Sequence, residues 1–214
     1  MRPIFAAVLL AAVVPACAYD GAGLEGTTAN PLRHDLGHRA FLDLTADSQV
    51  AVSASTDHGP LDGVSPKVVG GRAVLRATDD GVVLVEDLDV ALDDVVVPPG
   101  TIGTAPLHLT EVVLHLGTQI AAEGDWSEHS VIGAGAADLL LDWSLVLPDG
   151  TPYPLATQKL RDQMFTVVVD RTDSGAITAH VMTSATGELR TFADRVTLSD
   201  LQVEVVANRA VVVE

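Results

Sequence analysis

The stretch Asp138–Pro148, DLLLDWSLVLP, decides the expected fold. Every second residue across Leu139–Leu147 is apolar, whereas Asp142 and Ser144 fall on the opposite face. Strict alternation over this length is typical of a half-buried β-strand, because successive side chains of a strand point to opposite sides. The turn sequence PDG follows at 148–150. The stretch therefore predicts one long strand with an apolar and a polar face.

Two pairs of neighbouring segments predict β-hairpins. Arg72–Thr78 precedes Gly81–Leu92, and Phe165–Arg171 precedes Ala176–Ser184. The connections end in Asp-Gly and Ser-Gly, and glycine readily adopts the positive φ that tight hairpin turns require. We therefore expect antiparallel pairing in both places.

Three segments repeat one pattern in which two polar residues stand where alternation allows one. They are Val85–Leu92, Leu109–Leu116 and Leu198–Val205. A β-bulge absorbs such an extra residue and bends the strand. Bends in three strands favour a strongly curved sheet. The predicted fold class is all-β, a single antiparallel β-sandwich or closed β-barrel of about eight to ten strands.

One short helix is expected beside the sheet. Pro154 suits a first helical turn, and Ala156, Leu160 and Met164 follow at a spacing of four residues. Long Gly- and Pro-containing connections are expected at 56–70, 98–106 and 117–137.

The N-terminus, residues 1–18, reads as a signal peptide. Its apolar run Ile4–Val14 fits the apolar core of a secretory signal and is shorter than the ~20 residues that cross a bilayer. Ala16-Cys17-Ala18 fits an ordinary signal peptidase site, whereas Val14–Cys17 resembles a bacterial lipobox whose cysteine becomes lipidated. Both alternatives stay open, with Cys17 as the lipidation candidate. Residues 19–39 are then expected to form a flexible tether, and 40–214 the antiparallel β domain.

The charge balance limits the partners. The chain carries 12 Lys and Arg against 29 Asp and Glu, a formal net charge of −17. Such a surface repels phosphate, which argues against nucleic acid and against anionic lipid. We expect membrane contact only through an N-terminal lipid anchor. The sequence has no phosphate-binding loop, dinucleotide fingerprint or paired-cysteine motif, so no cofactor is predicted.

Histidines supply the metal candidates. His34 and His38 are four residues apart, and His58 is the nearest residue to complete a site. His108 and His115 would share a face only if the bulge expected near Glu111 lies between them. Solvated polar positions are the competing interpretation of both sets. The acidic turns, such as Asp79-Asp80, match no helical calcium loop and suit solubility instead.

Asp125–His129, DWSEH, is the stretch that most suggests catalysis. A nucleophilic Ser127 would need His129 within hydrogen-bond reach and a carboxylate behind it. Neighbours on one loop seldom converge in this way, so no catalytic residue is assigned. A loop anchored by Trp126 at the barrel rim is the alternative.

These observations favour an exported bacterial envelope protein, expected in the periplasm, the outer membrane or on the cell surface. The preferred function is binding of an apolar small molecule or lipid within the curved sheet. The alternative is a non-catalytic structural or protein-interaction module of the cell envelope. Because no catalytic motif occurs, an enzyme is the third choice.

Overall fold

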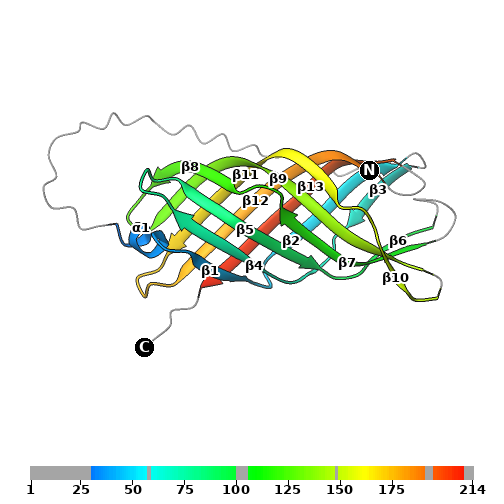
Figure 1. Cartoon of the computed structure of the whole chain (residues 1–214), viewed down its shortest axis with the longest axis horizontal. Coiled ribbons are helices and arrows are strands. Elements are labelled where there is room, and N and C mark those ends of the chain that lie inside the picture. The colour runs from blue at the N-terminus through cyan, green and yellow to red at the C-terminus, as the bar shows by residue number, and fades with distance from the viewer. Residues whose placement is uncertain (1–29, 57–58, 100–105, 148, 191–194, 210–214) are drawn as a thin grey trace, which may run out of the picture.

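The computed structural model describes residues 30–56, 59–99, 106–147, 149–190 and 195–209. Within them the chain forms one short helix and thirteen strands of a single antiparallel sheet, which curls into an elongated barrel (Figure 1). The elements are α1 (Pro31–Leu36), β1 (Ala40–Leu44), β2 (Gln49–Thr56), β3 (Gly59–Val64), β4 (Val68–Ala77), β5 (Val83–Leu92), β6 (Val95–Val97), β7 (Leu107–Leu116), β8 (Ile120–Trp126), β9 (Ser130–Val146), β10 (Pro152–Pro154), β11 (Gln158–Arg171), β12 (Ile177–Arg190) and β13 (Arg195–Arg209).

The sheet closes on itself as a ring of eight strands. The order is β1-β4-β5-β7-β9-β11-β12-β13, and β13 returns to β1 through the pairs Asp43↔Asn208 and Leu44↔Ala207. β8 takes over from β7 between β5 and β9, and the β2–β3 hairpin continues from β13. The expected all-β antiparallel fold is confirmed, in its barrel form.

The three expected bulges are present. The register shifts at Glu86 in β5, at Glu111 in β7 and at Ser199 in β13, where one strand has an extra residue against its partner. Glu111 has a φ of 53°, a left-handed conformation that is uncommon outside glycine. The sequence pattern therefore located the places where the wall bends.

The long strand and both hairpins are confirmed. Asp138–Val146 forms the second half of β9, with Leu139 and Leu141 buried. The hairpins are β4–β5 and β11–β12, and each turn contains a glycine of positive φ, Gly81 or Gly175. Ser144 differs from its expected exposed place. It is buried, and its hydroxyl is satisfied by a hydrogen bond donated to Glu111 Oε2 at 2.7 Å.

The helix expected at 154–164 is wrong. This segment forms β10 and the start of β11, and β11 pairs with β9. Leu160 is buried whereas Met164 is 61% exposed, so the residues assigned to one helical face lie on opposite faces of a strand. A bulge at Asp162, whose φ is 54°, separates them. Pairing across the sheet overrides the local helical spacing here.

Two other expectations need correction. The end of the expected tether forms α1, which packs onto the barrel instead of hanging free. The expected connections at 56–70 and 117–137 contain β3, β8 and the start of β9. The signal peptide at 1–18, with Cys17, lies outside the described residues. No helix of the described part is long and apolar enough to cross a membrane.

The core lies inside the barrel and is almost wholly aliphatic. Phe165 is its largest fully buried side chain, among leucines, valines and alanines. Among the described residues, the buried polar ones are Ser48, Ser144 and Thr183, and each hydroxyl is hydrogen-bonded. Charged side chains instead form ion pairs on the outer face, such as Lys159 with Asp138. The wall thus separates an apolar interior from a charged exterior.

Candidate functional site

The histidines near the N-terminal end of the domain do not form a site in the described structure. The side chain of His34 is 80% exposed and lies 3.6 Å from Asp35, and His38 is exposed. His58 falls outside the described residues. Across the described part of the chain, no three His, Cys, Asp or Glu side chains are grouped closely enough to hold a metal ion.

His108 and His115 both lie on the outer face of β7, as the bulge between them requires. His108 Nε2 lies 3.2 Å from Asp94, and His115 Nε2 lies 3.0 Å from Asp142. Each imidazole therefore has its own carboxylate.

The Asp125–His129 stretch contains no catalytic relay among its described contacts. Ser127 Oγ lies 2.7 Å from Ser130 Oγ, whereas His129 Nε2 lies 3.9 Å from Glu128. The hydroxyl and the imidazole thus contact different neighbours, so no base is placed to activate the serine.

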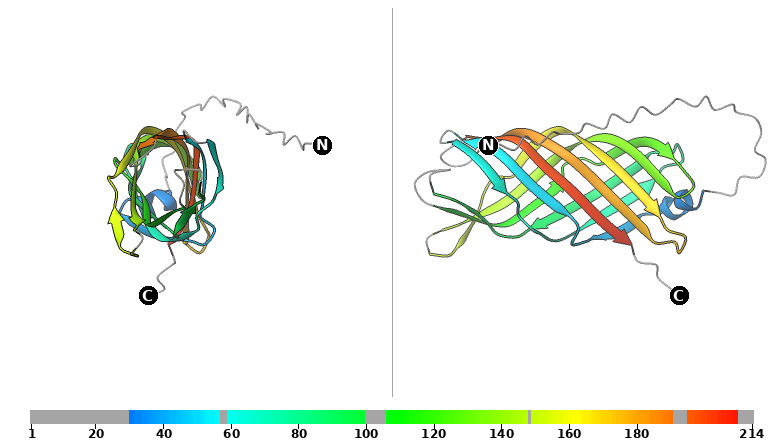
Figure 2. Two further views of the ribbon diagram at one scale, coloured as in Figure 1. Left: turned by 90° about the vertical axis from the view of Figure 1, so that its right-hand side faces the viewer. Right: turned by 180° about the vertical axis from the view of Figure 1, so that it is seen from behind.

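α1 closes one end of the barrel. Asn30 caps it, because its side-chain oxygen accepts from the N–H groups of Leu32 and Arg33 at 3.0 and 3.2 Å, and Pro31 suits the first turn. Leu32 and Leu36 are four residues apart, share one face and are fully buried. Seen along the barrel, α1 lies within the ring of strands (Figure 2). We call this helix the plug.

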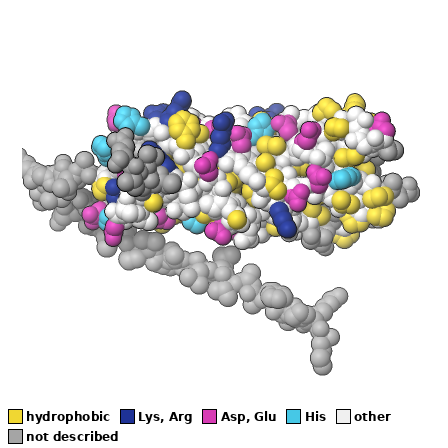
Figure 3. Space-filling view, turned by 90° about the horizontal axis from the view of Figure 1, so that it is seen from below, with side chains coloured by type: hydrophobic (Ala, Val, Ile, Leu, Met, Phe, Trp, Pro, Cys, Tyr) yellow, Lys and Arg dark blue, Asp and Glu magenta, His cyan; other side chains and the backbone are white. Residues whose placement is uncertain are grey.

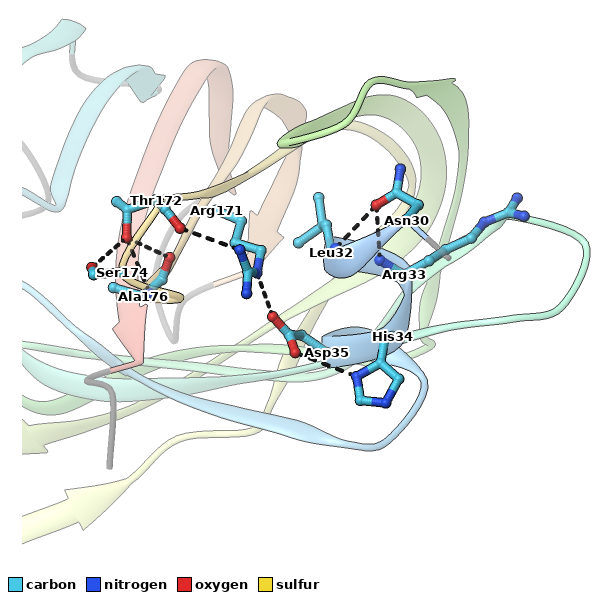
Figure 4. A network of polar contacts seen from close by, with 9 residues as sticks. All are labelled: Asn30, Leu32, Arg33, His34, Asp35, Arg171, Thr172, Ser174 and Ala176. Carbon is cyan, nitrogen blue, oxygen red and sulfur yellow. Dashed lines mark hydrogen bonds and ion pairs between the residues drawn. The ribbon is translucent and has the colours of Figure 1, made fainter. Parts of the chain in front are cut away.

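Polar contacts join the plug to the ends of the strands. Asn30 Nδ2 donates to the carbonyl of Ser127 at 2.6 Å, and Arg171 of β11 pairs with Asp35 at 2.6 Å. Figure 4 shows Asp35 between Arg171 and His34. Both partners of the Arg171–Asp35 pair are mostly shielded from water, with 20% and 28% of their side-chain surface exposed. These contacts hold the plug against two different strand ends.

Trp126 fixes a third side of the plug. Its indole N–H donates to the carbonyl of Gly81 at 2.6 Å, and the guanidinium of Arg33 lies 5.1 Å from its ring centroid, within the range of a cation–π contact. Trp126 thus joins the plug to the β4–β5 turn. This agrees with the alternative expectation that Trp126 anchors a loop at an end of the barrel.

The end of the barrel away from α1 carries exposed apolar side chains. β6, the start of β7, the end of β9 and β10 lie side by side there. Val96 of β6 is 60% exposed and Tyr153 of β10 is 50% exposed. Hydrophobic side chains gather at this end in the space-filling view (Figure 3). We call Val96 and Tyr153 the rim.

Trp143 lies close behind the rim. It is the second residue before Leu145, which pairs with Tyr153, and its half-buried side chain packs against the core. Its indole Nε1 is a buried donor with no hydrogen-bond partner. His115 Nε2 is the other such atom in the described structure, but it lies beside the carboxylate of Asp142. Sequence reasoning placed Trp143 on the apolar face and gave its N–H no role.

Comparisons with protein-family models, with curated proteins and with solved structures find no match. The described residues provide an apolar interior, a plug at one end of the barrel, an apolar rim at the other and one buried donor near that rim.

Proposed function

We propose that this protein binds an apolar small molecule or lipid inside its barrel. The observation that carries the proposal is the difference between the two ends of the barrel. Leu32 and Leu36 close one end, whereas exposed Val96 and Tyr153 border the other. An apolar ligand approaching this end would meet the exposed side chains of Val96 and Tyr153 before it is buried.

Burial of an apolar ligand inside the barrel is energetically favourable. Transfer of apolar surface out of water is worth about 25 cal/mol per Å². Small eight-stranded barrels are wide enough either to be filled by side chains or to hold one small ligand. Several inward positions carry alanine, including Ala137, Ala179 and Ala185, and the ion pairs outside keep the loaded barrel compatible with water.

A dye-binding experiment tests the proposal. The neutral probe N-phenyl-1-naphthylamine is titrated into residues 19–214, and its fluorescence is expected to rise saturably. Ala179 is fully buried on the inner face, so Ala179→Trp is expected to abolish the rise. The matched control is Thr178→Trp, on the opposite face of the same strand.

Folding is checked for each variant by circular dichroism and thermal unfolding. If Ala179→Trp does not fold, Ala185→Leu provides a smaller obstruction of the inner face. Equal dye uptake by the parent protein and by a folded inner-face variant would contradict binding inside the barrel.

We further propose that the protein is an exported envelope lipoprotein anchored through Cys17. The support is the sequence alone: an apolar run of signal-peptide length is followed by the only cysteine of the chain. In a bacterial host that labels lipoproteins with radioactive palmitate, the parent protein is expected to take up label and Cys17→Ala to lose it. Unlabelled parent protein released at Tyr19 would support ordinary secretion instead.

The second candidate is a protein-interaction module, which a patch on the outer wall favours. Ile132 of β9 is 56% exposed and Met164 of the adjacent β11 is 61% exposed. Exposed apolar patches often mark contact surfaces. Under this alternative the parent protein takes up no dye, and Ile132→Asp with Met164→Asp abolishes partner capture.

A further inference from the structure

The indole N–H of Trp143 needs a partner that the chain does not supply. Burying a hydrogen-bond donor without an acceptor costs free energy, and buried polar groups of native proteins are almost always paired. Trp126, the other tryptophan, follows this rule because it donates to the carbonyl of Gly81. Trp143 Nε1 is buried and has no acceptor. A bound molecule with an acceptor atom at this position would satisfy it.

The carbonyl of Trp143 has a hydrogen-bond partner within the chain, whereas its indole N–H has none. The carbonyl of Trp143 accepts from the N–H of Leu155 at 2.9 Å. Along β9, Leu139 and Leu141 precede Trp143 at the same alternation and are buried. The donor therefore lies at the rim end of an aliphatic surface, where the polar end of an otherwise apolar ligand would lie.

The charges nearby decide which acceptor fits. None of the described buried residues is a lysine or an arginine. A carboxylate ligand inside the barrel would therefore be buried without a counter-ion among these residues, which is strongly unfavourable. A neutral oxygen acceptor avoids this cost.

We propose that the barrel binds a long apolar molecule with one neutral oxygen acceptor, such as an ester or ketone, that accepts a hydrogen bond from Trp143 Nε1. This rests on the proposed apolar binding inside the barrel and specifies its ligand class. The acceptor lies near the rim, and the apolar chain extends toward the plug. Free fatty acids in their ionised form are excluded from this class.

The test compares three probes by displacement of N-phenyl-1-naphthylamine at pH 8: methyl laurate, laurate and tridecane. Trp143→Phe keeps an aromatic ring and removes the donor, and Trp126→Phe is the matched control at the plug end. One neutral hydrogen bond is worth about a three- to tenfold change in affinity. Trp143→Phe is therefore expected to lower the affinity for methyl laurate by that factor. Its affinity for tridecane should stay within about twofold of the parent value. Trp126→Phe should leave the ratio of methyl laurate affinity to tridecane affinity at the parent value, because a change at the plug acts on both ligands alike. Laurate should bind the parent protein more weakly than its ester.

Nuclear magnetic resonance of the unaltered protein gives a second readout that no folding defect can mimic. The two indole N–H signals are assigned with the Trp126→Phe variant. Methyl laurate should shift the Trp143 indole proton downfield, whereas tridecane should not.

The outcomes separate the two proposals. The ligand class would be overturned if tridecane and the ester bind but Trp143→Phe does not change the affinity for the ester. It would also be overturned if laurate binds as tightly as its ester. In both cases the proposal of apolar binding inside the barrel would stand. Failure of every probe to bind the parent protein would overturn both.

Discussion

Replacement of Leu32 by alanine tests whether α1 is a structural plug of the barrel. Leu32 is fully buried and belongs to the same core as the strands. The change removes three carbon atoms, worth about 2.4 kcal/mol at roughly 0.8 kcal/mol for each buried methylene. The cavity left behind adds to this loss, and buried Leu→Ala changes span about 2–5 kcal/mol. We therefore expect the free energy of unfolding to fall by about 3 kcal/mol.

The assay is urea unfolding followed by circular dichroism, with the slope of the transition checked for equality between variants. The control is His34→Ala, because His34 lies on the same helix with 80% of its side chain exposed. That change is expected to stay within about 0.5 kcal/mol. A loss below about 1 kcal/mol for Leu32→Ala, a value typical of surface changes, would refute the plug.

Two further predictions concern the wall. Glu86 contacts Arg76 and Arg39, and the hydrogen bond from Arg76 is the largest cause that holds the pKa of its carboxyl below the ordinary value of 4.5. Because the folded pKa lies below the unfolded one, this stabilisation is present above pH 4.5 and is lost as the pH falls through the folded pKa. The gap in melting temperature between parent and Glu86→Gln should therefore narrow from pH 6 to pH 3, and a constant gap would contradict this origin. A Cβ at Gly71, whose φ is +144°, would lie 2.0 Å from the carbonyl oxygen of Asp89, whereas one at Gly70 would meet nothing within 4 Å. Gly71→Ala should cost at least about 2 kcal/mol in urea unfolding and Gly70→Ala much less, and equal losses would show that backbone strain is not the cause.

Local patterns in the sequence predicted most of the fold. Alternation located the second half of β9, glycine turns located two hairpins, and paired polar residues located the bulges at Glu86, Glu111 and Ser199. These features depend on residues that are neighbours in the sequence, so they can be recognised from the sequence. Closure of the ring depends on β1 meeting β13, which lie at opposite ends of the described chain, and the sequence left sandwich and barrel open.

The plug was missed although its signals are present. Asn30-Pro31 is a good helix start, and Leu32 and Leu36 have helical spacing. Two apolar residues in six are too few to distinguish a helix from a tether. What fixes α1 is distant: Asp35 pairs with Arg171, 136 residues away.

The donor of Trp143 could not be singled out from sequence either. Both tryptophans read as apolar anchors, and only their surroundings separate them. Trp126 finds an acceptor 45 residues away at Gly81, and Trp143 finds none.

Native mass spectrometry tests the central claim most directly. Residues 19–214 are purified without detergent from a bacterial culture that exports the protein. The mass of the protein is measured before and after organic extraction. We expect an adduct of a few hundred daltons that extraction removes and that contains an ester or another neutral oxygen group. A clean protein mass together with no uptake of added methyl laurate or tridecane would contradict binding inside the barrel.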